Sequence, residues 1–423
     1  MRKLTKLAVL GLSLGMSLSL TGCTERTVTN DINASVKEES PVLKDESDRK
    51  SKDEYVNEKL NPSDYVISNT FDLNLYKQLL TNNQSFCVSP YSIKDCFSII
   101  YPGVSGDTRD EIDTVLNFDE RSHVFYENYD SEFLDEHLLV ANKGFINVER
   151  EREVDLDSLN VDSLEFVTMD SEGVESINSF VSESTKKYID NLVSEKDVNE
   201  NTLAVLVNAL YFNNEWKSAY ERAKVSFNGE TVDGFSGELA VKDVKELTDK
   251  VDLMRLQYKT DSPSENQYSL YVFDSVDGDK TSVDEYLTKI DDSKFENALD
   301  FSDYNGLTTY DEVKFLMPEY EVEFKSELTD VLKNMGLVAP FNNADDFSEI
   351  GDMVIGKVIH GTYMKVDYLG TEAAASTAMA MEDGVALVTQ EKKVKEITVD
   401  SDFTYVLKDD TNNVILFIGR YTK

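Results

Sequence analysis

The residue types that most often carry catalysis or bind metals are scarce in this sequence. Its 423 residues include three histidines and three cysteines. His123, His137 and His360 are far apart in the chain and lack the spacing of zinc ligands. A hydrolase would need one of them beside a nucleophile, yet the sequence contains no nucleophile-elbow motif and no glycine-rich phosphate loop. The sequence therefore predicts no catalytic residue, no metal site and no cofactor.

One segment near the C-terminus has an unusual composition. Residues 371–381 read Thr-Glu-Ala-Ala-Ala-Ser-Thr-Ala-Met-Ala-Met, with one charge and neither glycine nor proline. Alternate residues of a strand face opposite sides, so the odd-numbered set that starts at Thr371 could face a core while the even-numbered set faces outward or lies under a helix. Alanine favours helices and is poor in strands. A small-residue helix or surface loop is therefore compatible with this segment, and so is a strand that slides between existing strands.

The bulk composition describes an acidic protein with a large core. The net charge is −39, from 81 acidic and 42 basic residues. Such a surface repels nucleic acid and anionic lipid head groups, so neither is expected as a partner, and solubility is the simplest role of the charge. Apolar residues make up 40% of the chain, which is ample for a core. The sparse, odd set of Cys23, Cys87 and Cys96 does not form a disulfide framework.

The N-terminus has the features of an export signal. Basic residues precede an apolar run from Leu7 to Leu20, which is short for a membrane span and typical of a signal-peptide core. The run ends in Leu20-Thr21-Gly22-Cys23, which resembles the bacterial lipoprotein signal box and implies acylation of Cys23. We expect residues 1–22 to be a lipoprotein signal peptide and the polar residues 23–63 to be a lipid-anchored flexible linker. The expected location is the extracellular face of the bacterial cell membrane, anchored or released; an ordinary signal peptide with an incidental Cys23 is the alternative.

Helix and strand patterns alternate without another linker from residue 64 onward. Apolar residues four apart predict a helix over Phe71–Leu79, and Ser89-Pro90 is a typical helix start. The uninterrupted apolar run Leu203–Phe212 is typical of a strand covered on both faces. Further helices are predicted over Val174–Leu192 and over Leu328–Met335, the second ending at Gly336. Further strands are predicted around Met254–Tyr258, Tyr268–Phe273, Val313–Met317, Val354–Tyr368 and Val414–Tyr421. Early helices followed by mostly late strands predict an α+β fold.

Several long segments carry a family resemblance in their order along the chain. They are Ser85–Ile93 continued by Gly103–Thr108, Leu206–Trp216, His360 followed by Gly370–Ala375, and Val414–Arg420. Together they resemble the serpin family, and the resemblance covers nearly all of residues 64–423. It implies one domain over residues 64–423, with mixed β-sheets, surrounding helices and an exposed reactive-centre loop.

The resemblance also implies three working regions. The first is a hinge that enters the central sheet after cleavage: Gly370, Thr371, Glu372, Ala373, Ala374, Ala375, Ser376 and Thr377. The second is a polar group under the sheet, called the shutter in this family: Ser89, Ser92, Asn208 and His360. The third is Trp216 at the top of the sheet, in the region called the breach. Each of these residues can also have an ordinary structural role, such as a helix cap or a packed indole.

The implied activity is irreversible suicide-substrate inhibition of a serine endopeptidase, with a covalent complex and a monomeric inhibitor. No charged residue or proline interrupts the inward set of the hinge before Asp383, which favours an inhibitor. Counting from Thr371 as in the family, the resemblance implies a reactive bond at Gly384-Val385, or elsewhere within Met381–Val388 because the loop is several residues longer than is usual in the family. The small and aliphatic residues there suit an elastase-like or subtilisin-like protease, whereas Glu382 would suit a glutamate-specific one. A non-inhibitory serpin that acts as a cell-surface binding module is the alternative.

The sequence departs from the family pattern at two places. Tyr368 and Leu369 stand where the family often has an acidic residue, so a usual salt bridge ahead of the hinge is expected to be missing. Lys187 stands where many members have glycine, in the predicted helix before the long strand.

Overall fold

The computed structural model describes residues 67–80, 83–119, 121–132, 137–149, 159, 163–199, 201–260, 262, 265–351, 353–371 and 392–423. Several sequence predictions lie outside these residues. They are the signal peptide, Cys23, the linker, the hinge residues 372–377 and the bond Gly384-Val385.

Seven strands of the described residues form the central sheet. Along one path the order is β3-β2-β4-β13-β14-β5, and β12 also pairs with β13. The strands are β2 (Leu138–Asn147), β3 (Leu164–Val167), β4 (Ala204–Phe212), β5 (Asn214–Glu215), β12 (Tyr320–Glu327), β13 (Lys357–Val366) and β14 (Gly370–Thr371). β4 and β13 run parallel although 144 residues (213–356) separate Phe212 at the end of β4 from Lys357 at the start of β13, so long-range pairing holds the centre of the sheet together.

Two further sheets lie beside the central one. The first has the strand order β1-β17-β16-β10-β9-β8, and the second has the order β15-β11-β7-β6. The strands of the first are β1 (Phe86–Val88), β8 (Val244–Glu246), β9 (Val251–Gln257), β10 (Tyr268–Ser275), β16 (Phe403–Asp409) and β17 (Val414–Tyr421). Those of the second are β6 (Glu221–Phe227), β7 (Glu230–Leu239), β11 (Glu312–Pro318) and β15 (Val394–Thr398). Two residues, Lys392 and Lys393, lie between β15 and residues 372–391, which the structure does not describe, so this segment connects the central sheet to the second of the two further sheets along the chain.

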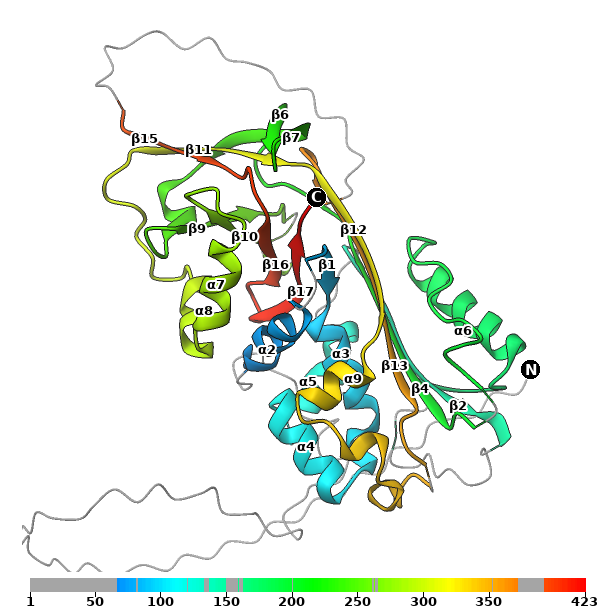
Figure 1. Ribbon diagram of the computed structural model, residues 1–423. Helices are drawn as coiled ribbons and strands as arrows, with labels where there is room; N and C mark the ends of the chain where they lie inside the picture. The colour runs from blue at the N-terminus through cyan, green and yellow to red at the C-terminus, as the bar shows by residue number, and fades with distance from the viewer. Residues whose placement is uncertain are drawn as a thin grey trace, which may run out of the picture. The chain divides into compact units, whose positions relative to one another are not determined.

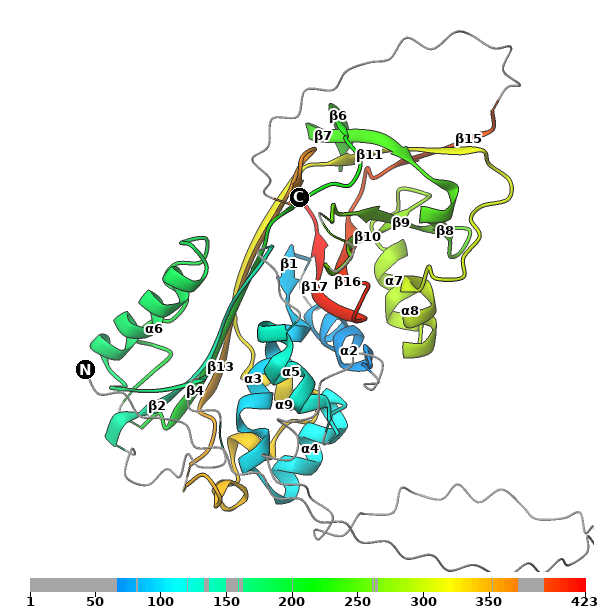
Figure 2. The ribbon, with the colours of Figure 1, turned by 180° about the vertical axis from the view of Figure 1, so that it is seen from behind.

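Helices cover the two faces of the central sheet unequally. One group lies on the first face, and α6 (Ser171–Ser184) lies on the opposite face (Figures 1 and 2). The first group comprises α2 (Thr70–Leu79), α3 (Pro90–Ile100), α4 (Gly106–Leu116), α5 (Ser122–Glu132) and α9 (Thr329–Asn334). α7 (Ser282–Lys289) and α8 (Asp292–Leu299) lie beside the six-stranded sheet. A separate cluster of buried apolar residues fills the space between α6 and the sheet, and it includes Ile177, Val207 and Ile359.

Most predicted elements are confirmed, and their burial explains why. α3 starts at Pro90 with Ser89 as its N-cap, and the Ser89 side chain accepts a hydrogen bond from Ser92 N. β4 is buried at every residue, as its apolar run predicts. α9 ends before Gly336, whose φ of +111° favours glycine. β13 is shorter than predicted because the chain turns after Val366, where Asp367 N donates to the carbonyl of Gly370.

The predicted helix Val174–Leu192 is wrong in its second half. α6 ends at Ser184, and the chain then reverses through Lys186 and Lys187, whose φ angles are +49° and +70°. The Thr185 hydroxyl stabilises the reversal by donating to the carbonyl of Val181 at 2.7 Å. Residues 185–199, which we call the strap, return alongside α6 and lead into β4. Leu192 is buried as predicted, but it packs from this strap and not from a helix.

Candidate functional site

The two central strands of the large sheet are paired at one end and separated at the other. Over its lower part β4 is the direct parallel neighbour of β13, from Val205 opposite Lys357 to Tyr211 opposite Tyr363. Above this pairing, Thr371 of β14 lies between Val366 of β13 and Asn214 of β5. We call this place, where two paired strands part around a third, the fork.

The register of the two strands is the same on both sides of the fork. Val205 lies opposite Lys357, a difference of 152 residue numbers (357 − 205). Asn214 and Val366, which flank Thr371, differ by the same number (366 − 214). A strand that extended β14 downward would therefore move β4 and β13 apart without sliding one along the other. Register shifts in sheets exchange inward and outward faces, so an unchanged register keeps the buried residues of both strands buried.

Trp216 fixes the turn that brings the chain into the fork. Its backbone N donates to the carbonyl of Leu369 at 3.0 Å, and its indole Nε1 donates to the carbonyl of Asp367 at 2.8 Å. The ring stacks on Tyr258, with centroids 4.4 Å apart. Trp216 therefore fixes the conformation of the turn at residues 367–370 through two hydrogen bonds, one from its backbone and one from its indole ring.

Gly370 and Thr371 are the two described hinge residues, and both fit the fork closely. A Cβ at Gly370 would lie 2.1 Å from the carbonyl oxygen of Asn214, so no larger residue fits there, and its φ of +155° is also one that glycine tolerates best. The Thr371 side chain is fully buried, and its hydroxyl lies 2.6 Å from the hydroxyl of Tyr258. Thr371 thus points inward, as the alternation of its segment predicts.

The structure brings together the four residues expected under the sheet, which we call the polar cluster. Asn208 and His360 are register partners on β4 and β13, and Ser89 and Ser92 lie at the start of α3 below them. Ser92 Oγ donates to Asn208 Oδ1 at 3.1 Å, and Ser89 N donates to His360 Nε2 at 3.0 Å. His360 Nδ1 bonds to Asn208 Oδ1 across the β4–β13 pair. The polar cluster therefore joins β4 to β13, the two strands that would separate if β14 extended downward between them.

His360 is neutral in this arrangement. Its Nε2 accepts a hydrogen bond from Ser89 N, so the hydrogen-bond network assigns the ring proton to Nδ1, which donates to Asn208. Burial lowers the pKa of His360 to about 3, which agrees with a neutral ring. All four residues of the cluster have no exposed surface, so His360 has no access to a substrate from solvent.

Arg222 contacts the residue that departs from the family pattern ahead of the hinge. The Arg222 guanidinium lies 4.3 Å from the centroid of the Tyr368 ring, within cation–π range. β6 thereby holds the turn beside the hinge through an aromatic contact at a position where the family often has an acidic side chain. Sequence reasoning did not identify Arg222 or Tyr258, because each meets its partner across more than a hundred residues of chain and belongs to no motif.

The described residues contain neither a membrane-spanning helix nor a metal-binding group of side chains. No helix in this part of the chain is long and apolar enough to cross a membrane. No group of three or more His, Cys, Asp or Glu side chains among these residues is arranged to hold a metal ion.

The two mixed sheets, the antiparallel six-stranded sheet, the surrounding helices and the fork in the central sheet define an α+β protein of the serpin fold. A family model described as "Serpin (serine protease inhibitor)" matches residues 67–423, so the chain belongs to the serpin family. Protease inhibition is the general activity that this membership supports.

Similar proteins extend across distant organisms. An uncharacterized serpin-like protein of Methanosarcina acetivorans is 27% identical, over 99% of this chain and 98% of its own. The crystal structure of Serpin48, a highly specific serpin of the insect Tenebrio molitor, is 26% identical with a TM-score of 0.68, over 84% of this chain and 96% of that one. The native-state structure of the thermophilic serpin tengpin has a TM-score of 0.70 at 19% identity, over 86% and 95% of the two chains, and supports the fold alone.

Proposed function

We propose that this chain is an irreversible suicide-substrate inhibitor of a serine endopeptidase, and that its cleaved reactive loop becomes a new strand between β4 and β13. The unchanged register across the fork is the observation that carries the proposal. Loop insertion in serpins is an established case of strand addition and of release of stored strain. The proposal assigns that mechanism to this chain and its named residues.

Extending the register of β14 assigns a partner to each residue of the hinge. Thr371 pairs with Asn214 and Val366, so antiparallel continuation places Ala374 between Tyr211 and Tyr363. The same continuation places Thr377 between Asn208 and His360 of the polar cluster. Insertion of Thr377 would break the hydrogen bond between His360 Nδ1 and Asn208 Oδ1. A hydroxyl can both donate and accept hydrogen bonds, so the Thr377 side chain would replace this bond for both residues.

The small side chains of the hinge agree with the packing on the α6 side. The even-numbered residues 374, 376 and 378 would face α6 and the strap, where a Cβ at Gly361 would already lie 2.8 Å from Leu192. The sequence supplies Ala374, Ser376 and Ala378 at these positions. Larger side chains would have to displace the apolar cluster under α6.

The free energy of insertion comes from backbone pairing on two sides. Each new hydrogen bond stabilises the sheet by a net of about 0.5–1.5 kcal/mol, so a dozen of them give on the order of 10 kcal/mol. The burial of loop side chains adds to this. Such a gain is available only after cleavage frees one end of the loop.

Cleavage and trapping follow from protease chemistry. The protease serine attacks the carbonyl carbon of Gly384, or of a neighbour within Met381–Val388, and an ester forms as the peptide bond breaks. The new amino group leaves with a proton. Insertion then moves the ester-linked protease along the sheet and distorts its active site before water hydrolyses the ester. The small and aliphatic loop residues support an elastase-like or subtilisin-like target.

The proposed location is the outer face of a bacterial cell membrane. Removal of residues 1–22 and acylation of Cys23 would anchor the chain, and residues 23–63 would act as a tether. A flexible coil of about 40 residues has a root-mean-square length of about 35 Å. Proteases that reach the cell surface are then the expected partners of a monomeric inhibitor.

A panel of serine proteases tests the proposal. We expect an SDS-resistant complex with at least one elastase-like or subtilisin-like enzyme, and mass spectrometry of the released C-terminal peptide then gives the cleaved bond. A chain that is nicked in the loop should melt well above the intact chain. If no protease is trapped and nicking leaves the melting temperature unchanged, the chain is a non-inhibitory serpin and the proposal is wrong.

A further inference from the structure

Three tyrosine rings stack across the junction of β4 and β13. Tyr188 of the strap stacks on Tyr211 of β4, with centroids 4.0 Å apart and planes 7° apart. The same ring lies 5.7 Å from the ring of Tyr363 on β13. Tyr211 and Tyr363 are register partners with centroids 6.3 Å apart. One side chain of the strap thus contacts both strands at the same level of the sheet.

The strap is held to the sheet and to α6 at several points around this stack. The carbonyl of Asp190 accepts a hydrogen bond from Lys325 of β12, and Asn178 of α6 bonds both the N–H and the carbonyl of Val193. Leu192 packs closely against Gly361 of β13. These contacts fix the position of the strap, and they place Tyr188 over β4 and β13.

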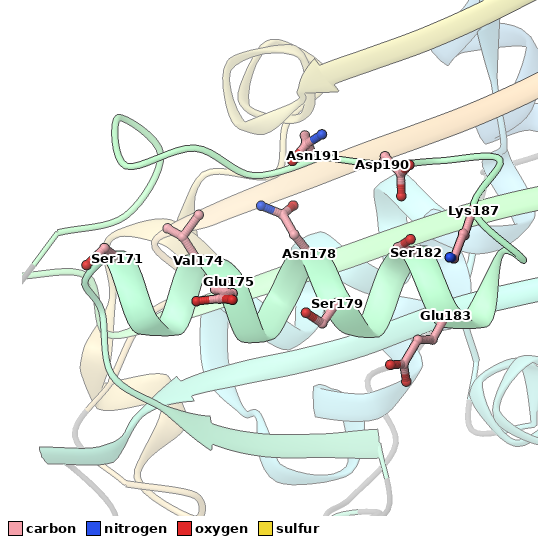
Figure 3. A pocket seen from close by; sticks show the side chains of 10 residues that line it. All are labelled: Ser171, Val174, Glu175, Asn178, Ser179, Ser182, Glu183, Lys187, Asp190 and Asn191. Carbon is pink, nitrogen blue, oxygen red and sulfur yellow. The ribbon is translucent and has the colours of Figure 1, made fainter.

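A groove lies between the strap and α6. Figure 3 shows Lys187, Asp190 and Asn191 of the strap opposite the side chains of α6 that line this groove, whose volume is about 570 Å³. Outward movement of the strap at these residues therefore disrupts little packing on that side. Lifting the strap breaks the tyrosine stack on its inner side, together with its hydrogen bonds to Asn178 and Lys325.

We propose that Tyr188 acts as a clasp that sets the rate of strand insertion; this inference rests on the proposed function. Neighbouring strands lie about 4.8 Å apart, so a new strand between β4 and β13 separates Tyr211 from Tyr363 by about twice that spacing. Tyr188 cannot keep both stacking contacts across that separation. The stack stabilises the state before insertion and is broken during insertion, so it raises the barrier.

The clasp lies early on the insertion path. Tyr211 and Tyr363 are three register positions below the pair that flanks Thr371, whereas Asn208 and His360 are three positions further down. A strand that extends from the fork therefore reaches the tyrosine stack before the polar cluster. Tyr188 then influences the competition between insertion and hydrolysis of the acyl-enzyme, which decides how many inhibitor molecules are consumed for each protease trapped.

Replacement of Tyr188 separates this role from a merely structural one. Tyr188→Ala should raise the limiting rate of inhibition by about three- to tenfold, the size expected for loss of an aromatic contact, and should lower the stoichiometry of inhibition toward one. Tyr188→Phe keeps the stacked ring and should retain the parental rate. Phe180→Ala is the matched control, because the ring contact of Phe180 of α6 is with Phe145 of β2 and lies outside the tyrosine stack. It should lower the melting temperature and leave the limiting rate unchanged.

Equal limiting rates for the parent and Tyr188→Ala would overturn the inference, and so would an equal acceleration by Phe180→Ala. A protease-free measurement separates these outcomes from failure of the proposed function. A synthetic peptide of residues 371–381 is added in excess, and the formation of a thermally stabilised complex is timed for each variant. Faster peptide uptake by Tyr188→Ala supports the clasp even if no protease is trapped, whereas unchanged uptake rejects the clasp even if the parent is an inhibitor.

Discussion

The hydroxyl groups of Thr371 and Tyr258 lie 2.6 Å apart at the fork, and the Thr371 side chain is completely buried. Tyr258 is also buried and stacks on Trp216, which holds the turn before Thr371. The first inward residue of the hinge is thus already in a strand position with its polar group paired. Insertion of the rest of the loop would continue a strand whose first two residues, Gly370 and Thr371, are in place.

A charge at this position should block the continuation. Thr371→Arg would put an unpaired cation between two strands and against Tyr258, at a cost of several kcal/mol. We expect the variant to be cleaved in the loop at a normal rate without forming an SDS-resistant complex. Thr398→Arg is a suitable control, because Thr398 lies on β15 with its side chain exposed. Normal complex formation by Thr371→Arg would contradict insertion at the fork.

Arg222 should restrain the turn before the hinge. Its contact with Tyr368 is at the surface, where a cation–π interaction contributes about 0.5–1 kcal/mol. Arg222→Ala should therefore lower the midpoint of urea unfolding slightly and speed uptake of the 371–381 peptide. Trp216 is the single tryptophan of the chain, so its emission reports the fork directly.

Lys224→Ala is the matched control for Arg222. Lys224 lies two residues further along β6 and makes an exposed ion pair with Asp233, whereas Arg222 makes the contact with the Tyr368 ring. It should change neither the peptide uptake nor the Trp216 emission. Equal effects of the two variants would show that loss of positive charge on β6, and not the ring contact, is responsible.

Patterns that are continuous in the sequence predicted the core of the fold. The apolar run of β4 predicts a strand covered on both faces, and β4 is buried at every residue. Ser89-Pro90 predicts the start of a helix, and α3 begins there. The family resemblance brought Ser89, Asn208 and His360 together, although no spacing rule relates residues so far apart. Their hydrogen bonds, and their place six register positions below the fork, could be obtained only from the structure.

The strap could not be predicted from local patterns. Apolar residues continue at helical spacing from Ile177 to Leu192, so periodicity alone extends α6 through the reversal. Left-handed backbone at Lys186 and Lys187 is rare for lysine and has no local signal. The tyrosine stack was missed for the same reason, because Tyr188 contacts β4 and β13 only once the chain has turned back.

Lys187 should carry backbone strain that glycine would relieve. At a φ of +70° a side chain costs about 1–2 kcal/mol, and glycine removes this cost but adds up to about 1 kcal/mol of unfolded-state entropy. Lys187→Gly should therefore raise the free energy of unfolding by up to about 1 kcal/mol. Lys196→Gly, at a strap residue whose φ is not positive, should lower it. A loss of stability for Lys187→Gly as large as that for Lys196→Gly would contradict the strain.

Acid should weaken the link between β4 and β13 through His360. Its pKa is about 3 in the folded chain because of burial, against 6.5 for an ordinary histidine. The folded state thus binds fewer protons between these values, so the stability present above pH 6.5 is lost as the pH falls toward 3. Asp409 acts in the opposite sense, because burial raises its pKa to about 6 and the stability it contributes below pH 3.8 is lost as the pH rises through 6.

A comparison with His360→Gln isolates the histidine, because Asp409 and the other titrating groups are present in both proteins. Glutamine can accept the hydrogen bond from Ser89 N and does not titrate. The free energy of unfolding of the parent relative to the variant should fall by about 1.4 kcal/mol per pH unit below pH 6.5. Urea titrations at pH 7.0, 6.0 and 5.0 measure this difference. A difference that stays constant over the three pH values would mean that His360 titrates normally, and the neutral link across the β4–β13 pair would then be wrong.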